Sequence, residues 1–224
     1  MTTFTRPATI SNLPTGTYPT WDGSEAAMCD LVKRMRRAGV RVLAIDWDQT
    51  FLRCHTKSQW YGSASELRNH IRPSICALVR AAHKAGLYVS IVTFSDQVHL
   101  IHEVLDMVFP NITRSTRPFV VRGNCGTWSV CPKSHTNSFV PEDMKQRGKI
   151  PHILSVIQNL PSCQQEGKTK EVGSIITSPN HVVLIDDDVN NIQTAMACRF
   201  HAFWMNPENT GAVWNQMSAL FSSV

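Results

Sequence analysis

Short apolar runs alternate along the chain with segments in which apolar residues recur every three or four positions. The runs are rich in β-branched residues and predict buried strands at 40–46, 87–93, 118–121, 181–186 and 201–205. The periodic segments predict helices at 24–39, 73–85, 96–109, 150–160, 189–198 and 211–221. This alternation is typical of an α/β fold: a doubly wound, mainly parallel, Rossmann-like sheet with helices on both faces.

The chain length, 224 residues, suits one α/β domain with at most a small accessory element. We expect an irregular lead-in at 1–22, a single domain at 23–224 and an irregular insertion at about 122–148. A polar linker is expected at 161–174. Only about twenty residues separate Thr50 from the next predicted helix, which leaves room for a flap but not for a helical cap domain.

Composition narrows the classes of partner. The net charge of +5 favours anionic partners such as phosphorylated substrates, but it is too small to indicate nucleic acid by itself. No apolar run approaches the ~20 residues that span a bilayer, and the first residues lack the apolar block of a secretory signal. The seven cysteines are odd in number and scattered, unlike a disulfide framework. We therefore expect a cytoplasmic protein without membrane contact, and its oligomeric state stays open.

Polar residues follow three of the predicted strands at the point where each strand ends. The first strand runs into Asp46, Asp48 and Thr50, the second into Thr93, and the fourth into Asp186, Asp187 and Asp188, with Asn190 and Asn191 just beyond. Lys149 stands immediately before the helix predicted at 150–160. Ligands of open α/β sheets bind outside the carboxyl ends of the strands, so we expect these side chains to meet at one edge.

The order of these segments resembles the four motifs of the haloacid dehalogenase-like (HAD) superfamily. The matching pattern is hhhhDxDxT, then hhhT, then a lysine before a helix, then hhhhDD with a nearby asparagine, and it covers about residues 40 to 205. A single DxD is weak, whereas a strand-terminal DxDxT followed by a strand-terminal DD is specific. The short connections resemble those of capless or minimally capped members, such as magnesium-dependent phosphatases.

The resemblance implies a phosphatase that acts through an aspartyl-phosphate. Asp46 would be the nucleophile, and splitting the displacement into two steps makes each one easier. Asp48 would protonate the leaving oxygen and then activate water as general acid/base, which favours phosphoester chemistry over dehalogenation. Thr93 would donate its hydroxyl and backbone to a phosphoryl oxygen, and Lys149 would offset the charge of nucleophile and phosphate. Backbone amides after Asp46 would complete the phosphate cradle.

The resemblance also implies a magnesium ion, because crowded carboxylates repel one another unless a cation lies between them. Mg²⁺ accepts carboxylates, waters and a phosphate oxygen. By family precedent it takes the side chains of Asp46 and Asp187 and the backbone carbonyl of Asp48. Asp186 would support these ligands from behind, and Asp188 or Asn191 would hold a metal-bound water.

Several alternatives stay open. The same intermediate suits a phosphotransferase or mutase, and the fold could also serve as a non-catalytic interaction module. Three further lysines compete with Lys149 for the site: Lys133, Lys145 and Lys168. A zinc site is an alternative interpretation of Cys125, Cys131 and His135. The C-x5-C spacing is wider than that of most structural zinc sites, and a fourth ligand is not obvious. An open site suits a bulky substrate, either a phosphoprotein or a polynucleotide end.

Overall fold

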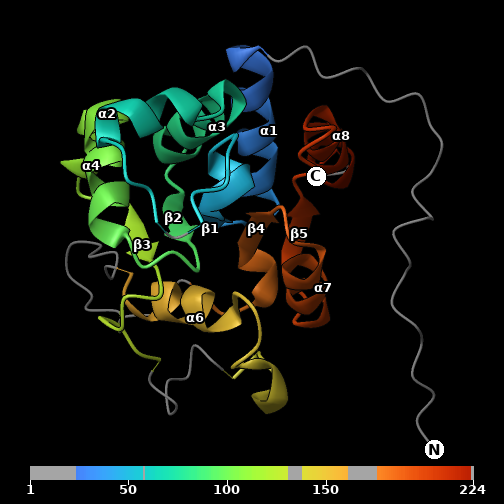
Figure 1. Ribbon diagram of the computed structural model, residues 1–224. Helices are drawn as coiled ribbons and strands as arrows, with labels where there is room; N and C mark the ends of the chain where they lie inside the picture. The colour runs from blue at the N-terminus through green and yellow to red at the C-terminus, as the bar shows by residue number, and fades with distance from the viewer. Residues whose placement is uncertain (1–23, 58, 131–137, 161–175, 223–224) are drawn as a thin grey trace, which may run out of the picture.

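The sheet is parallel throughout and lies at the centre of the molecule (Figure 1). The computed structural model describes residues 24–57, 59–130, 138–160 and 176–222. Its strands are β1 (Val42–Ile45), β2 (Tyr88–Val92), β3 (Val120–Arg122), β4 (Val182–Asp186) and β5 (His201–Trp204). They lie in the order β3-β2-β1-β4-β5, and each neighbouring pair is parallel. The predicted α/β, Rossmann-like fold class is confirmed.

All six predicted helices are present, each within a few residues of its expected bounds. They are α1 (Glu25–Arg37), α3 (Pro73–Lys84), α4 (Val98–Val108), α6 (Ile150–Gln158), α7 (Val189–Ala197) and α8 (Gly211–Leu220). The sequence did not predict two single-turn α-helices, α2 (Ala64–Leu67) and α5 (Pro110–Thr113), or the short 3₁₀ turns Arg68–His70, Glu142–Met144 and Pro179–His181. Such short elements contain too few residues to show a helical period.

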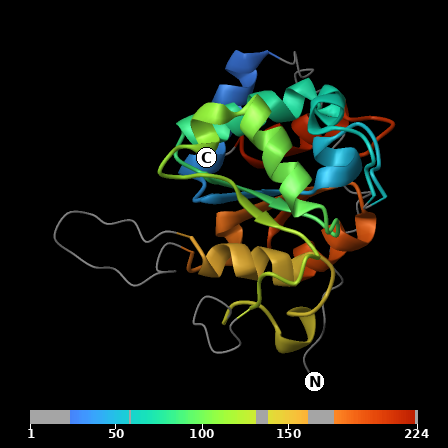
Figure 2. The same cartoon turned by 60° about the vertical axis from the view of Figure 1, so that its left-hand side comes forward.

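Alternate residues of each strand face opposite layers of helices. In β1, Leu43 and Ile45 belong to the core that α1, α3, α4 and α8 cover, whereas Val42 and Ala44 belong to the core that α6 and α7 cover. Figures 1 and 2 show the sheet between these two layers. Both faces of a parallel strand are therefore buried, which explains why the strands read as continuous apolar runs.

Local signals set the ends of the helices. Ser24 caps α1 by accepting a hydrogen bond from Ala27 N at 3.1 Å, and Gly39 follows the helix with φ +96°. Pro73 occupies the first turn of α3, and Gly86 with φ +87° follows its end. The starts and ends that the sequence predicted for these two helices are confirmed.

Parts of the predicted organisation lie outside the described residues. These are the lead-in 1–22, the linker 161–174, and residues 131–137 of the insertion, which include Cys131 and His135 of the zinc alternative. The described part of the insertion begins with the end of β3 and contains the 3₁₀ turn at Glu142–Met144. None of the described helices is both long enough and apolar enough to cross a bilayer.

We predict that Leu78→Ala lowers the free energy of unfolding by about 2–5 kcal/mol, because Leu78 on α3 is fully buried in the core and the change leaves a cavity. Urea unfolding followed by circular dichroism measures the change. Met107→Ala on α4, at a side chain that is 48% exposed, is the matched control and should cost much less. Equal losses in the two variants would show that the core is not where we place it.

Candidate metal centre

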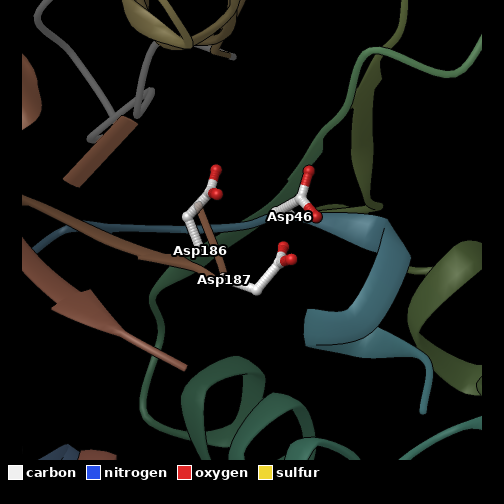
Figure 3. Close-up of side chains that lie close together, drawn as sticks. All are labelled: Asp46, Asp186 and Asp187. Carbon is white, nitrogen blue, oxygen red and sulfur yellow. The ribbon is translucent and has the colours of Figure 1, made fainter. Parts of the chain in front are cut away.

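Three carboxylates meet where β1 and β4 end. Asp46 follows β1, Asp186 is the last residue of β4, and Asp187 is next in the chain. The two strands are neighbours with Ile45 opposite Ile185, and the Asp46 N–H donates to Ile185 O at 2.9 Å. One carboxylate oxygen of each aspartate lies within 4.8 Å of the others (Figure 3). The expected meeting of residues 46 and 187 from separate segments is confirmed.

Lys149 completes this group from the start of α6. Its Nζ lies 2.8 Å from Asp46 Oδ1, and both side chains are buried. The same nitrogen lies 3.7 Å from the centroid of the Phe94 ring, which covers the ammonium. Of the competing lysines, Lys145 pairs with Glu142, while Lys133 and Lys168 lie outside the described residues. The structure therefore brings Lys149 to Asp46, as expected.

The cluster holds more negative charge than its one ammonium balances. Burial raises the pKa of Asp46 well above its usual value; Lys149 opposes the shift, while Asp186 and Asp187 add to it. Burial also raises the pKa of Asp186 to about 6 and raises that of Asp187. Mg²⁺ is a hard cation that prefers oxygen ligands, and the cluster offers three carboxylates whose negative charge is only partly balanced. The donor set therefore fits the expected ion, although it does not identify it.

Asn191 and the backbone orient Asp186. Asn191 Nδ2 donates to both carboxylate oxygens of Asp186 at 3.1 Å, and the Asp188 N–H donates to Oδ1 at 2.8 Å. Asp188 itself caps α7 through the Asn190 N–H at 2.8 Å. These contacts agree with a supporting role for Asp186, but its carboxylate also belongs to the cluster. The division of metal ligands between Asp186 and Asp187, and the water-holding role of Asp188 or Asn191, stay predictions.

Asp48 faces a different set of partners. It lies in the turn Trp47–Phe51, in which Asp48 (φ −70°, ψ 136°) and the following Gln49 (φ +56°) have non-helical backbone angles. Its carboxylate accepts hydrogen bonds from Thr56 N at 2.9 Å and Thr56 Oγ1 at 3.1 Å, and His55 Nδ1 lies 3.1 Å away. The Asp48 carboxylate is thus bonded to Thr56, which lies eight residues further along the chain. Metal binding by the Asp48 carbonyl and acid/base action by its carboxylate stay predictions.

The expectation for Thr93 needs one correction. Its backbone N–H donates to Arg122 O at 2.9 Å, so this group is already used by strand β3. The backbone donation that we expected from Thr93 is therefore wrong. Its buried hydroxyl accepts from Ser95 N at 3.1 Å and keeps its own hydrogen for another acceptor. A phosphate cradle requires backbone N–H groups that are not already bonded. Among the described residues, no backbone oxygen accepts a hydrogen bond from Trp47 N or Asp48 N.

Sequence reasoning missed several contacts that hold the site together. Thr50 donates its hydroxyl to Asp187 Oδ1 at 3.2 Å, which joins the turn to the DD segment. Gly148 has φ +50°, and a Cβ there would lie 2.8 Å from Asn191 Oδ1. The glycine before Lys149 was a readable signal for this close approach. Thr56 carried no comparable signal, because it lies in a loop without periodicity.

We predict that the metal-free protein loses stability as the pH rises from about 4 to about 6. Asp186 binds its proton more tightly in the folded state, where its pKa is about 6 rather than 3.8. Its contribution is therefore complete below the unfolded pKa and is lost as the pH rises through the folded one. The loss should be on the order of 1–3 kcal/mol in urea unfolding with a chelator. Asp186→Asn should flatten this decline, and an unchanged decline would assign it to other groups.

Comparisons of the chain with protein-family models, with curated proteins and with solved structures found no match. The fold and the geometry of the acidic cluster are therefore what any functional proposal for this protein has to rest on.

Proposed function

We propose that this protein is a Mg²⁺-dependent phosphomonoester hydrolase of the HAD type, with Asp46 as its nucleophile. One observation carries the proposal: the buried carboxylate of Asp46 contacts the ammonium of Lys149 on one side and lies next to the carboxylates of Asp186 and Asp187. An aspartate that served only as a turn or capping residue would not need a buried cation and two further carboxylates, one buried and one half-buried, beside it. The order of the motifs along the chain supports the same assignment.

The proposed reaction consists of two successive displacements at phosphorus. An oxygen of Asp46 forms a bond to phosphorus while the bond from phosphorus to the ester oxygen breaks, and Asp48 gives the departing oxygen its proton. Water then attacks the aspartyl-phosphate, Asp48 takes a proton from it, and the Asp46 carboxylate is released. Mg²⁺, when bound by the acidic cluster, supplies positive charge for the phosphoryl oxygens.

Fixed groups of the chain serve both steps. The Lys149 ammonium offsets the charge of Asp46 and of the arriving phosphate, and burial strengthens this interaction because water is excluded. Thr56 fixes the carboxylate of Asp48 through two hydrogen bonds, so the acid needs little reorganisation before it transfers a proton. The hydroxyl of Thr93 and the N–H groups of Trp47 and Asp48 are the donors that we assign to the phosphoryl oxygens.

The short connection after the turn bears on the substrate. Between Phe51 and α3, the described residues form only α2 and one 3₁₀ turn, which together span 64–70. This agrees with a small flap in place of a cap domain. We therefore propose a bulky substrate, such as a phosphoprotein or a phosphorylated nucleic-acid end, which an open site admits.

We predict that Asp46→Asn lowers turnover of p-nitrophenyl phosphate by at least about a thousandfold, because the amide cannot replace the nucleophile. Steady-state kinetics with and without Mg²⁺ measures this, and circular dichroism checks that the variant is folded. The exposed Asp106→Asn on α4 is the matched control and should keep full activity. Substantial turnover by Asp46→Asn would exclude the proposed nucleophile.

We predict that millimolar Mg²⁺ raises the melting temperature of the protein and that Asp187→Asn removes most of this rise. The reason is linkage, since an ion that binds only the folded state stabilises it. Once the Mg²⁺ concentration exceeds its dissociation constant, each further tenfold increase should add about 1.4 kcal/mol to the free energy of unfolding. Differential scanning fluorimetry with Mg²⁺ and Ca²⁺ series measures the shift, and Asp106→Asn again serves as control. A full shift in Asp187→Asn would remove this residue from the metal site.

A further inference from the structure

Arg72 is an unusual side chain in the described structure, because it is an arginine that is only 9% exposed. Burial lowers its pKa, the nearby charge of Arg53 lowers it further, and Asp187 opposes the shift. Its Nε is buried and has no hydrogen-bond partner among the described residues. Burying a guanidinium in this way is costly unless other contacts repay it. The contacts that Arg72 does make are therefore informative.

Those contacts join Arg72 to the turn that follows Asp46. Residues 70–72 pair with residues 51–53 around an isolated antiparallel bridge between Leu52 and Ile71. The Arg72 backbone N–H donates to Phe51 O at 3.0 Å. Its side chain reaches further back and donates from Nη2 to Gln49 O at 2.9 Å. Arg72 thus binds two carbonyls of the same turn, one with its backbone and one with its guanidinium.

Gln49 is the residue of this turn that most needs support. Its φ of +56° lies in the left-handed region, which residues other than glycine seldom adopt. It stands between Asp48, the assigned acid/base, and Thr50, which contacts Asp187. If Gln49 relaxed to an ordinary backbone conformation, the carboxylate of Asp48 and the hydroxyl of Thr50 would both be displaced.

We infer that Arg72 is a positioning residue for the candidate catalytic site: by holding the Gln49 carbonyl, it fixes the turn that aims Asp48 and Thr50. Its charge also lies near Asp187, so a single guanidinium both fastens the turn and partly balances the acidic cluster. A lysine would keep the charge but lack the planar fork that reaches Gln49 O while remaining buried. This inference rests on the proposed function for its catalytic consequence but not for its structural one.

The first test measures the turn itself and needs no activity. In Arg72→Met, amide hydrogen exchange of a peptide covering residues 46–54 should speed up by at least about tenfold, while peptides from α3 and β2 stay unchanged. Arg53→Met is the matched control, since Arg53 lies in the same pair of segments but its guanidinium donates to Asn69 O at 2.7 Å, outside the turn. Unchanged exchange at 46–54 in Arg72→Met would overturn the inference.

The second test asks whether the fixed turn matters for catalysis. Arg72→Met should lower kcat for p-nitrophenyl phosphate by about 10- to 100-fold with KM within about twofold, because a small misplacement of Asp48 affects the transition state more than binding. Arg72→Lys should recover only part of this, and guanidinium at tens of millimolar should partly restore Arg72→Ala. A lower melting temperature with normal kcat would reduce Arg72 to a structural residue and overturn the inference. A wild-type protein without turnover would instead defeat the proposed function, and the exchange result would still decide the role of Arg72.

Discussion

The ion pair between Lys149 and Asp46 is the contact on which the arrangement of the site depends. It joins the start of α6, on one face of the sheet, to the end of β1 in its centre. A buried ion pair is a poor source of stability, because desolvation of both charges offsets their attraction. Here the pair also lies beside two further carboxylates, whose charge it balances only in part. Such a cluster contributes little to the stability of the fold, and its three carboxylates could hold a metal ion.

The path of the chain around Lys149 shows how closely its position is determined. Gly148 adopts a left-handed conformation and leaves no room for a Cβ beside Asn191. Asn191 in turn holds both oxygens of Asp186. The residue that places the ammonium and the residue that orients one of the acids are therefore packed directly against each other. The lysine and the DD segment, about 37 residues apart in the chain, form one structural unit.

Most of the fold could be predicted from the sequence. Of the site, the acidic residues could be predicted, but several of the contacts that position them could not. The strands were readable because both of their faces are buried, and helices such as α1 and α3 because each has one apolar stripe. Asp46, Asp186 and Asp187 were readable because strand ends of a parallel sheet converge. The error at Thr93 arose because its N–H pairs with Arg122 on β3, and only the register between the two strands reveals that bond. The contacts of Thr56 with Asp48 and of Arg72 with Gln49 could not be predicted either. They involve residues outside the regular part of any helix or strand, where the sequence has no periodicity that would indicate a contact.

The small size of the flap explains why so many contacts converge on the turn after Asp46. Enzymes that close a lid over the substrate can assemble their catalytic groups during closure. In the described part of this chain, the connection between the turn and α3 is too short for such a lid, so the side chains of the turn have to be aligned by contacts within the chain. The turn is accordingly bonded from three sides: by Thr56 at Asp48, by Arg72 at Gln49 and by Asp187 at Thr50. Preorganisation of this kind lets an open site keep its geometry without help from the substrate.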